Sequence, residues 1–269
     1  MIVHADRFVR GWHTPDGPVG LRARLAGTSL EAEAWGPGAG WALDQLPRFV
    51  GVDDDDRSFE PLHATVERAW RRLPGLRLGA TDQVADVIVA TIIGQKVAGK
   101  DARTSWRRLV YRHGSPAPGI EGLWVPPSTE ALASMTWDDF HTLGLERTRA
   151  TTIIEVAQRI ARLEESATMP PDEADTRLRA MRGVGPWTAA VVRRCSFGDP
   201  DAVEVGDYHL KNHVAWNLAG EPRGTDERML ELLEPWRGQR GRVVRLLKAA
   251  GDAPPRWGPR MPSSDVARL

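Results

Sequence analysis

The stretch "RLRAMRGVGPWTAAVVRRC", residues 177–195, decides the fold. Two glycines, Gly183 and Gly185, bracket one apolar residue between two runs whose apolar side chains have helical spacing. Gly183 offers the positive φ that a tight helix exit favours, and Gly185 lets the chain turn again without a Cβ. Pro186 suits the first turn of a helix, where its missing N–H would have no helical partner. The sequence therefore predicts a helix ending at Arg182, a hairpin and a second helix.

The start of the second helix predicts an anion site. The backbone N–H groups from Gly185 to Thr188 and the positive end of the helix dipole suit a phosphate. Val184, at the hairpin tip, is expected to face a groove or the sugars of a bound strand. An ordinary turn between two helices explains the same residues. The rest of the chain must therefore decide between an anion site and an ordinary turn.

Composition sets the broad class. The chain has 269 residues and 41% hydrophobic content, which predicts a globular protein with more than one lobe. One cysteine, Cys195, excludes an internal disulfide framework and cysteine-ligated metal sites, and we interpret it as a core residue. The first residues contain no long apolar run and no later window reaches the length of a membrane span, so we expect a cytoplasmic protein.

The formal net charge is zero, which counts against nucleic-acid binding by bulk electrostatics alone. Two local clusters are basic, and each is either a solvated helix face or a binding surface. They consist of Lys96, Lys100, Arg103, Arg107, Arg108 and Arg112, and of Arg237, Arg240, Arg242, Arg245 and Lys248. The acidic run Asp53 to Asp56 lacks the glycine and glutamate of a calcium loop, so we interpret it as a solvated turn or helix cap.

The chain changes character near residue 60. Residues 1–60 are expected to form a small β-containing lobe, with a hairpin that turns at Gly27 and Thr28. Residues 61–269 are helical almost throughout, which predicts a mainly α fold. One helix should be capped by Thr81 or Asp82 and end at Gly94; others should end at Gly114 and Gly144.

The segment "GDPDAVEVGDYHLKNHVAWNL", residues 198–218, sharpens the reading of the hairpin. Asp207 ends a short apolar stretch and directly precedes a helical run from Tyr208 to Leu218. Taken alone, Asp207 is a helix N-cap.

Taken together, "LRAMRGVGPWTAAVV", the Gly-Asp-Pro loop and "VGDYHLKN" resemble the signature of the helix-hairpin-helix DNA glycosylase superfamily, in its 3-methyladenine DNA glycosylase II branch. "ATIIGQKVAGKDA", "LGLERTRATTI" and "LEPWRGQRGRVVRLL" extend the resemblance to about residues 45–250. It implies a two-lobed helical body with the active site in the cleft between the lobes. We expect a six-helix lobe over about 81–205 and a second lobe from 61–80 plus 207–250.

The resemblance also implies roles for single residues. Asp207 matches the catalytic aspartate, which would stabilise the positive charge that builds on the sugar as the bond to a flipped base breaks. Trp187 and Tyr208 are the expected base pocket. The expected DNA-binding residues are Gln95, Lys96, Gly183, Val184, Gly185, Thr188 and Lys211.

The reaction type follows from position 187. Relatives that also cut the strand carry a nucleophilic lysine there, and this chain has Trp187, so we expect a monofunctional glycosylase without lyase activity. It would release an alkylated, 3-methyladenine-like purine in base excision repair and leave an abasic site. The expected partner is double-stranded DNA with damaged bases, and the expected state is a monomer. No cofactor is expected; relatives hold Na⁺ or K⁺ on the hairpin backbone, here at Met181 and Val184, and the sequence leaves that site open.

Three positions depart from the branch. Gln239 and Arg245 stand where it usually has further aromatic residues, which thins the base pocket. Lys96 stands where relatives place the glutamine or leucine that wedges into the space left by a flipped base. A glycosylase for a different lesion, or a damaged-DNA-binding protein with little turnover, therefore stays an alternative.

Overall fold

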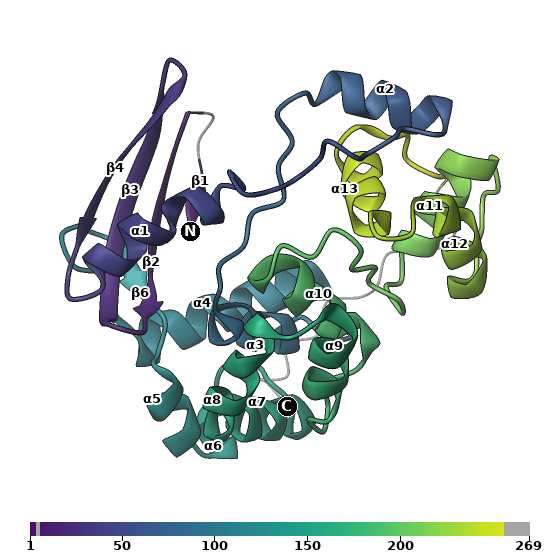
Figure 1. Ribbon diagram of the computed structural model, residues 1–269. Coiled ribbons are helices and arrows are strands. Elements are labelled where there is room, and N and C mark those ends of the chain that lie inside the picture. Colours follow the sequence, from purple (N-terminus) through teal and green to yellow (C-terminus); the bar gives the residue numbers. More distant parts are fainter. Residues whose placement is uncertain (4–5, 256–269) are drawn as a thin grey trace. The chain divides into compact units, whose positions relative to one another are not determined.

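The computed structural model describes residues 1–3 and 6–255, and the chain in it divides into two compact units (Figure 1). The first unit comprises Met1–Pro47 and Gln83–Glu164; the second comprises Arg48–Asp82 and residues 165–255. Residues 256–269 of the expected helical body lie outside the described residues. None of the helices in the described ranges is both long and apolar enough to cross a membrane.

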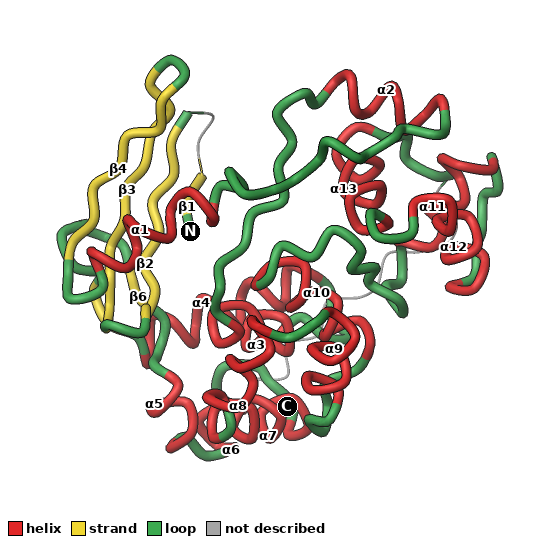
Figure 2. The backbone as a smooth tube through the Cα atoms, in the orientation of Figure 1, coloured by secondary structure: helices red, strands yellow, loops and turns green. Residues whose placement is uncertain are grey.

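A four-stranded antiparallel sheet in the order β1-β2-β3-β4 opens the first unit (Figure 2). Its strands are β1 (Ile2–Val3), β2 (Arg7–Thr14), β3 (Gly17–Ala26) and β4 (Ser29–Trp35). The predicted hairpin is confirmed, because β3 pairs with β4 across a turn in which Gly27 has φ +63°. Along β3, buried Leu21 and Ala23 alternate with exposed Arg22 and Arg24, so one face of the sheet packs inward.

Side chains of β2 and α3 (Val84–Ile93) tie the sheet to the helices of the first unit. Arg10 forms an ion pair with Asp86. Trp12 Nε1 donates to Gln83 Oε1 at 3.0 Å, and Gln83 Nε2 donates to the backbone oxygen of His13 at 2.9 Å. The N-terminal sheet therefore belongs to the same packing unit as the helices that follow residue 83.

The helical part of the first unit differs from expectation in where one predicted helix is divided. Its further elements are α1 (Ala39–Phe49, whose last residues enter the second unit), α4 (Gly99–His113), β5 (Ser115–Pro116), β6 (Trp124–Val125), α5 (Thr129–Ser134), α6 (Trp137–His141), α7 (Arg147–Gln158) and α8 (Ile160–Glu164). The expected ends at Gly94 and Gly114 are confirmed. The helix expected to run to Gly144 is two helices, because Thr136 starts α6 with a reciprocal capping box to Asp139.

The cap of α3 was predicted from the wrong residues. Its first turn is capped neither by Thr81 nor by Asp82 but by Glu164, whose two carboxylate oxygens accept from Val84 N at 2.7 Å and Ala85 N at 2.8 Å. Burial raises the pKa of the Glu164 carboxyl, and these two hydrogen bonds oppose that rise. The start of α3 is thus capped by the last residue of α8, which is also where the sequence of the first unit's helical part ends.

The second unit is all helical. Its elements are α2 (Ala64–Arg72), η1 (Glu165–Thr168), α9 (Pro171–Arg179), α10 (Pro186–Ser196), α11 (Leu210–Ala219), α12 (Asp226–Leu233), η2 (Glu234–Trp236) and α13 (Arg240–Ala250). Figure 1 shows α2, α11, α12 and α13 gathered around a shared core. Val66, Val214, Met229 and Val243, one from each of these helices, are fully buried there. Cys195, interpreted from sequence as core, is only partly buried.

A buried ion pair corrects two interpretations of the sequence. The side chain of Arg242 is 0% exposed and that of Asp54 is 5% exposed. Arg242 Nη1 donates to Asp54 Oδ2 at 2.9 Å, and the same oxygen accepts from Leu78 N at 2.9 Å. The acidic run is therefore not simply a solvated turn, and Arg242 of the C-terminal basic cluster is not on a solvated face, because this arginine needs a buried counter-charge.

We expect Arg242→Met to lower the free energy of unfolding by about 3–5 kcal/mol, because it leaves the Asp54 carboxylate buried and unpaired. A urea titration followed by circular dichroism measures this. Arg71→Met is the matched control, since Arg71 pairs with Glu67 on an exposed helix face and should change stability by less than about 1 kcal/mol. Equal midpoints for the two variants would contradict a structural role for the buried pair.

Candidate functional site

The hairpin forms between α9 and α10 in the second unit. The helix before it ends at Arg179, three residues earlier than the expected Arg182, because the chain already turns at Met181, where the backbone oxygen accepts from Val184 N at 3.0 Å. Gly183 has φ +82°, so the predicted left-handed glycine is confirmed. Pro186 stands in the first turn of α10, as predicted.

Gly185 behaves differently from the expectation. Its φ of −93° and ψ of −178° are extended values that any residue adopts, so the turn itself does not require glycine here. A Cβ built on Gly185 would meet no atom of the described residues within 4 Å. Nothing in this unit therefore demands a glycine at 185, and the space in front of its backbone is open.

The side chains around the hairpin face two ways. Val184 is 5% exposed and Thr188 is 2% exposed, so both side chains pack inward. The side chain of Val184 therefore does not face outward as expected, because an apolar group between two packed helices gains more from burial. DNA contact by Val184 or Thr188 stays a prediction for their backbone. Trp187, the next residue of the first turn of α10, is partly exposed.

Asp207 caps the start of α11. Its Oδ1 accepts from His209 N at 2.8 Å and from Leu210 N at 2.9 Å, and its own N–H donates to the backbone oxygen of Glu204 at 3.1 Å. The helix begins at Leu210, two residues later than expected, because the Asp207 side chain closes a turn first. Among the described residues, Oδ2 accepts no hydrogen bond. The carboxylate is thus fixed in direction through one oxygen and open at the other.

Two further predicted site residues lie next to this cap. Tyr208 is 72% exposed, and its ring meets His209 edge-on at 4.8 Å between centroids. Lys211 Nζ lies 3.9 Å from Asp226 Oδ2. The Tyr208 ring is therefore accessible from outside the second unit's core, directly beside Asp207 in the chain.

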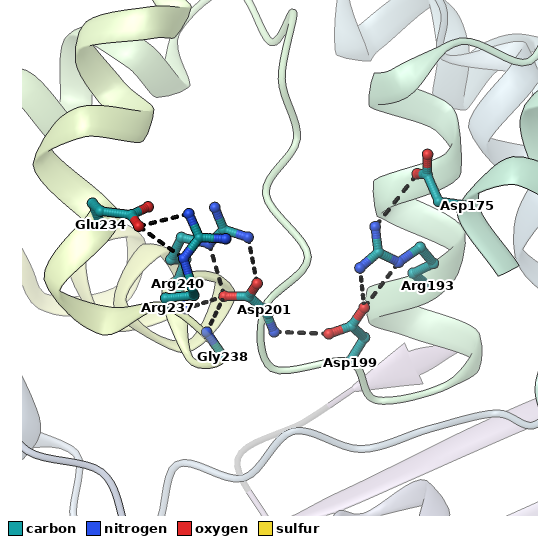
Figure 3. A network of polar contacts seen from close by, with 8 residues as sticks. All are labelled: Asp175, Arg193, Asp199, Asp201, Glu234, Arg237, Gly238 and Arg240. Carbon is teal, nitrogen blue, oxygen red and sulfur yellow. Dashed lines mark hydrogen bonds and ion pairs between the residues drawn. The ribbon is translucent and has the colours of Figure 1, made fainter. Parts of the chain in front are cut away.

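Charged side chains tie the loop that carries Asp207 to its neighbours (Figure 3). Asp199 Oδ2 accepts from Arg193 Nε of α10 at 2.9 Å, and Asp199 Oδ1 accepts from Asp201 N at 2.8 Å. Asp201 Oδ1 then accepts from Gly238 N at 2.8 Å and from Arg240 N at 3.0 Å. The loop is therefore held between the second hairpin helix and the start of α13.

Glu204 adds a buried anchor closer to Asp207. Its side chain is 4% exposed, and Oε1 accepts from Arg194 Nε of α10 at 2.7 Å. Its Oε2 is buried without a partner in the described part of the chain. Sequence reasoning missed the anchors at Asp199, Asp201 and Glu204; the available signal was the occurrence of three acids within ten residues after Arg193 and Arg194.

Gln95 and Lys96 lie in the first unit, in the turn between α3 and α4. Lys96 is exposed and has φ +54°, a left-handed conformation that is uncommon for residues other than glycine. Arg149, which is 4% exposed, donates through Nη1 to the backbone oxygen of Ile93 at 2.7 Å and so holds the end of α3. The buried guanidinium of Arg149 therefore holds the end of α3, where the turn that carries Lys96 begins.

Gln239 and Arg245, which depart from the expected pattern, lie in or next to α13. Gln239 Oε1 accepts from Arg242 Nε at 2.7 Å, so this side chain supports the buried Asp54–Arg242 pair. Arg245 is partly buried in α13. For the monovalent cation that the sequence leaves open, the backbone oxygens of Met181 and Val184 are the kind of ligand that hard cations prefer, and no observation here tests the site. The described residues hold no group of three His, Cys, Asp or Glu side chains able to bind a metal ion.

The family follows from the hairpin and the acidic loop together. Residues 89–238 match the family described as HhH-GPD superfamily base excision DNA repair protein. This chain belongs to that superfamily. The match includes the Gln95–Lys96 turn, the hairpin and the loop that carries Asp207, and it ends where η2 leads into α13.

Solved structures of this superfamily share the fold. A 3-methyladenine DNA-glycosylase from Archaeoglobus fulgidus superposes with a TM-score of 0.78 at 20% identity, over 91% of this chain and 87% of that one. A 3-methyladenine DNA glycosylase from Schizosaccharomyces pombe, solved with abasic DNA, gives 0.58 at 17% identity, over 76% and 94%. The mainly helical fold with an N-terminal antiparallel sheet is thereby confirmed.

Curated relatives are similar over part of their length. A Mycobacterium tuberculosis protein named "Probable bifunctional transcriptional activator/DNA repair enzyme AlkA" is 34% identical over 172 residues, which are 62% of this chain. The chain spans only 32% of that protein's length. A DNA-3-methyladenine glycosylase of Bacillus subtilis is 24% identical over 212 residues, or 73% of this chain and 69% of that protein.

The anchors of the loop make its stability depend on pH. Burial by itself would raise the pKa of the Asp201 carboxyl, but the hydrogen bonds and charge of Arg240 outweigh it and hold the pKa below its usual range. A carboxyl with a lowered folded pKa stabilises the fold above its unfolded pKa, and this contribution is lost as the pH falls through the folded value.

We therefore expect Asp201→Asn to lower the free energy of unfolding by about 1.5–3 kcal/mol at pH 7. The difference from the parent should shrink as the pH falls below about 4, because the parent carboxyl then loses its charge as well. Urea titrations at several pH values measure it, with Asp55→Asn, an exposed carboxyl, as the control. A difference that stays constant down to pH 2 would contradict the ionic origin.

Proposed function

We propose that this chain is a monofunctional DNA glycosylase that hydrolyses the N-glycosidic bond of a flipped, alkylated purine and leaves an abasic site. The observation that carries the proposal is the Asp207 carboxylate, which two backbone N–H groups hold through Oδ1 while Oδ2 stays open. Membership of a base excision repair superfamily supports it, and so does similarity to proteins named as 3-methyladenine DNA glycosylases.

The chemistry needs one fixed negative charge. As the bond between sugar and base breaks, positive charge develops on the sugar, and a preoriented carboxylate stabilises that charge without reorganising. The open Oδ2 of Asp207 can face the sugar or hold the attacking water. An alkylated purine already carries positive charge and leaves readily, so a paired general acid is not required.

The residues beside Asp207 suit an electron-poor base. Tyr208 is exposed, and Trp187 lies partly exposed at the start of α10. The π face of either ring attracts a cationic purine. Because position 187 holds tryptophan, no amine is present there to form a Schiff base, so the proposed enzyme does not cut the strand.

The hairpin supplies the proposed phosphate contacts with DNA. The open space in front of Gly185 and the N-terminus of α10 suit a phosphate that approaches the bare backbone. The ion pairs Arg193–Asp199 and Arg194–Glu204 connect this helix to the loop of Asp207. A phosphate held by α10 and a sugar facing Asp207 would therefore be positioned by one rigid set of contacts. Lys96, on its exposed turn, is the proposed wedge in the space left by the base.

Asp207→Asn tests the catalytic assignment. Asparagine caps a helix about as well as aspartate, so the melting temperature should hardly change. Base release should fall by at least about a hundredfold, because a preorganised electrostatic group is lost. The assay incubates methylated duplex DNA with the protein and counts strand breaks; with no lyase activity, breaks in the parent reaction appear only after hot alkali.

Asp172→Asn is the matched control, an exposed aspartate in the first turn of α9 of the same unit, and should release bases like the parent. An Asp207→Asn protein that melts like the parent and excises bases at a comparable rate would make the residue a structural cap only. A parent protein that binds methylated duplex without releasing any base would instead support the damaged-DNA-binding alternative.

Gly185→Asp tests the phosphate site. The new carboxylate should repel the strand and weaken binding to duplexes of any sequence by at least about tenfold, since phosphate contacts carry no sequence information. Gly75→Asp is the control: a Cβ there also meets no atom within 4 Å, it lies in the same unit, and the added charge is identical. Equal duplex affinities for the two folded variants would remove the hairpin from the interface.

A further inference from the structure

The outer face of α4 is strongly basic. Successive residues of a helix point about 100° apart, and on that wheel Lys100, Arg103, Arg107 and Tyr111 fall on the half opposite the buried Ser105 and Leu109. Arg108 and Arg112 flank the buried side, and the Arg112 side chain is still exposed. Asp101 is the one acidic residue of the helix, in a chain whose formal net charge is zero. The first basic cluster of the sequence is therefore a local surface and not a consequence of overall charge.

One end of this face is hollowed. Arg108, Tyr111 and Arg112 of α4 line an open hollow of about 430 Å³ together with Thr142, which follows α6. A space of this size accommodates a single nucleotide or a small ligand. Sequence reasoning had no means to find it, because Thr142 lies 30 residues from Arg112 in the chain.

The groups that line the hollow are held in place. Tyr111 is 54% exposed, and its ring is supported edge-on by Trp124 at 5.4 Å between centroids. Arg112 Nη1 donates to Thr142 Oγ1 at 2.7 Å, and the Thr142 hydroxyl donates in turn to the backbone oxygen of Asp139 at 2.8 Å. An aromatic face and a guanidinium are thus preorganised side by side, and both remain accessible.

We propose that this hollow binds an unpaired nucleotide of a single DNA strand. The base stacks on Tyr111, the guanidinium groups of Arg112 and Arg108 take its phosphate, and the strand continues along Arg107 and Arg103. Aromatic rings interleaved with cations are how proteins bind single strands without reading sequence. Planar guanidinium groups suit phosphate better than lysine does.

The proposal goes beyond the proposed glycosylase activity and does not depend on it. The hollow lies in the first unit, whereas the hairpin and Asp207 lie in the second. A duplex has no free base face to offer Tyr111, so this surface selects frayed, gapped or otherwise unpaired DNA. An acidic protein segment would supply charge but no ring, and it is an outcome of the test below.

The experiment measures binding of a fluorescent ten-nucleotide oligothymidylate to the full chain by anisotropy. Tyr111→Ala should weaken binding about 5- to 150-fold, the loss expected for one stacked base. Tyr111→Phe, which keeps the ring, should retain parent affinity. Arg103→Gln with Arg107→Gln should flatten the slope of log affinity against log salt by about 1.4, for two phosphates. Arg159→Gln, an exposed arginine between α7 and α8, is the control and should change neither quantity.

Other arms separate the alternatives. Tyr111→Ala should weaken oligonucleotide binding by the same factor in the parent and in a Gly185→Asp background, so a failed hairpin proposal leaves this one intact. Oligonucleotide binding that Tyr111→Ala weakens in neither background would overturn it. If polyglutamate displaced the oligonucleotide equally well per charge, the basic face of α4 would be a surface that binds anions in general. Equal displacement, nucleotide for nucleotide, by thymidine monophosphate would replace the strand with a free nucleotide.

Discussion

The candidate site depends on carboxylates that fasten one irregular loop. Between α10 and α11 the chain has no regular secondary structure, and a loop of that kind is mobile unless other groups hold it. Here Asp199, Asp201 and Glu204 each meet an arginine of a neighbouring helix. The last of these anchors lies three residues before Asp207, which then ties itself to the next helix through two backbone N–H groups. The direction of one carboxylate is thereby set by a series of charged contacts.

This use of charge has an energetic logic. A buried ion pair contributes little net stability, because desolvation consumes most of the attraction, but a wrong arrangement that leaves one partner alone costs several kcal/mol. Such pairs penalise alternative loop conformations more than they stabilise the native one. Glu204 and the Asp54–Arg242 pair, all at most 5% exposed, are in this regime. These ion pairs therefore favour one loop arrangement around Asp207 and add little to the free energy of unfolding of the second unit.

The two glycines of the hairpin illustrate how geometry separates structural from functional demands. Gly183 has a left-handed φ that folding requires, while Gly185 has extended dihedrals and open space above it. No contact among the described residues of the unit requires the small size of Gly185. We infer that the requirement comes from a ligand, and a phosphate that approaches the helix N-terminus is such a ligand. The basic face of α4 is likewise unexplained by packing, since Lys100, Arg103 and Arg107 stand opposite the buried side of the helix.

The sequence by itself determined the features that depend on interactions between residues a few positions apart in the chain. These include the β3–β4 turn at Gly27, the positive φ of Gly183, the helix stop at Gly94 and the local cap at Asp207. Propensity, dihedral preference and short-range hydrogen bonding decide such features, and all are written in the local order of residues.

Only the tertiary structure decided the contacts between distant segments. Glu164 caps a helix 79 and 80 residues away, and Arg242 finds its counter-charge 188 residues away. A sequence shows that an acid and a base exist but not which pair will meet, because that choice depends on how whole helices pack and which charges their packing buries. The same reason separates Arg240 and Arg242 of the C-terminal cluster, which form ion pairs within the second unit, from Arg103, Arg107 and Arg112 of α4, which are exposed.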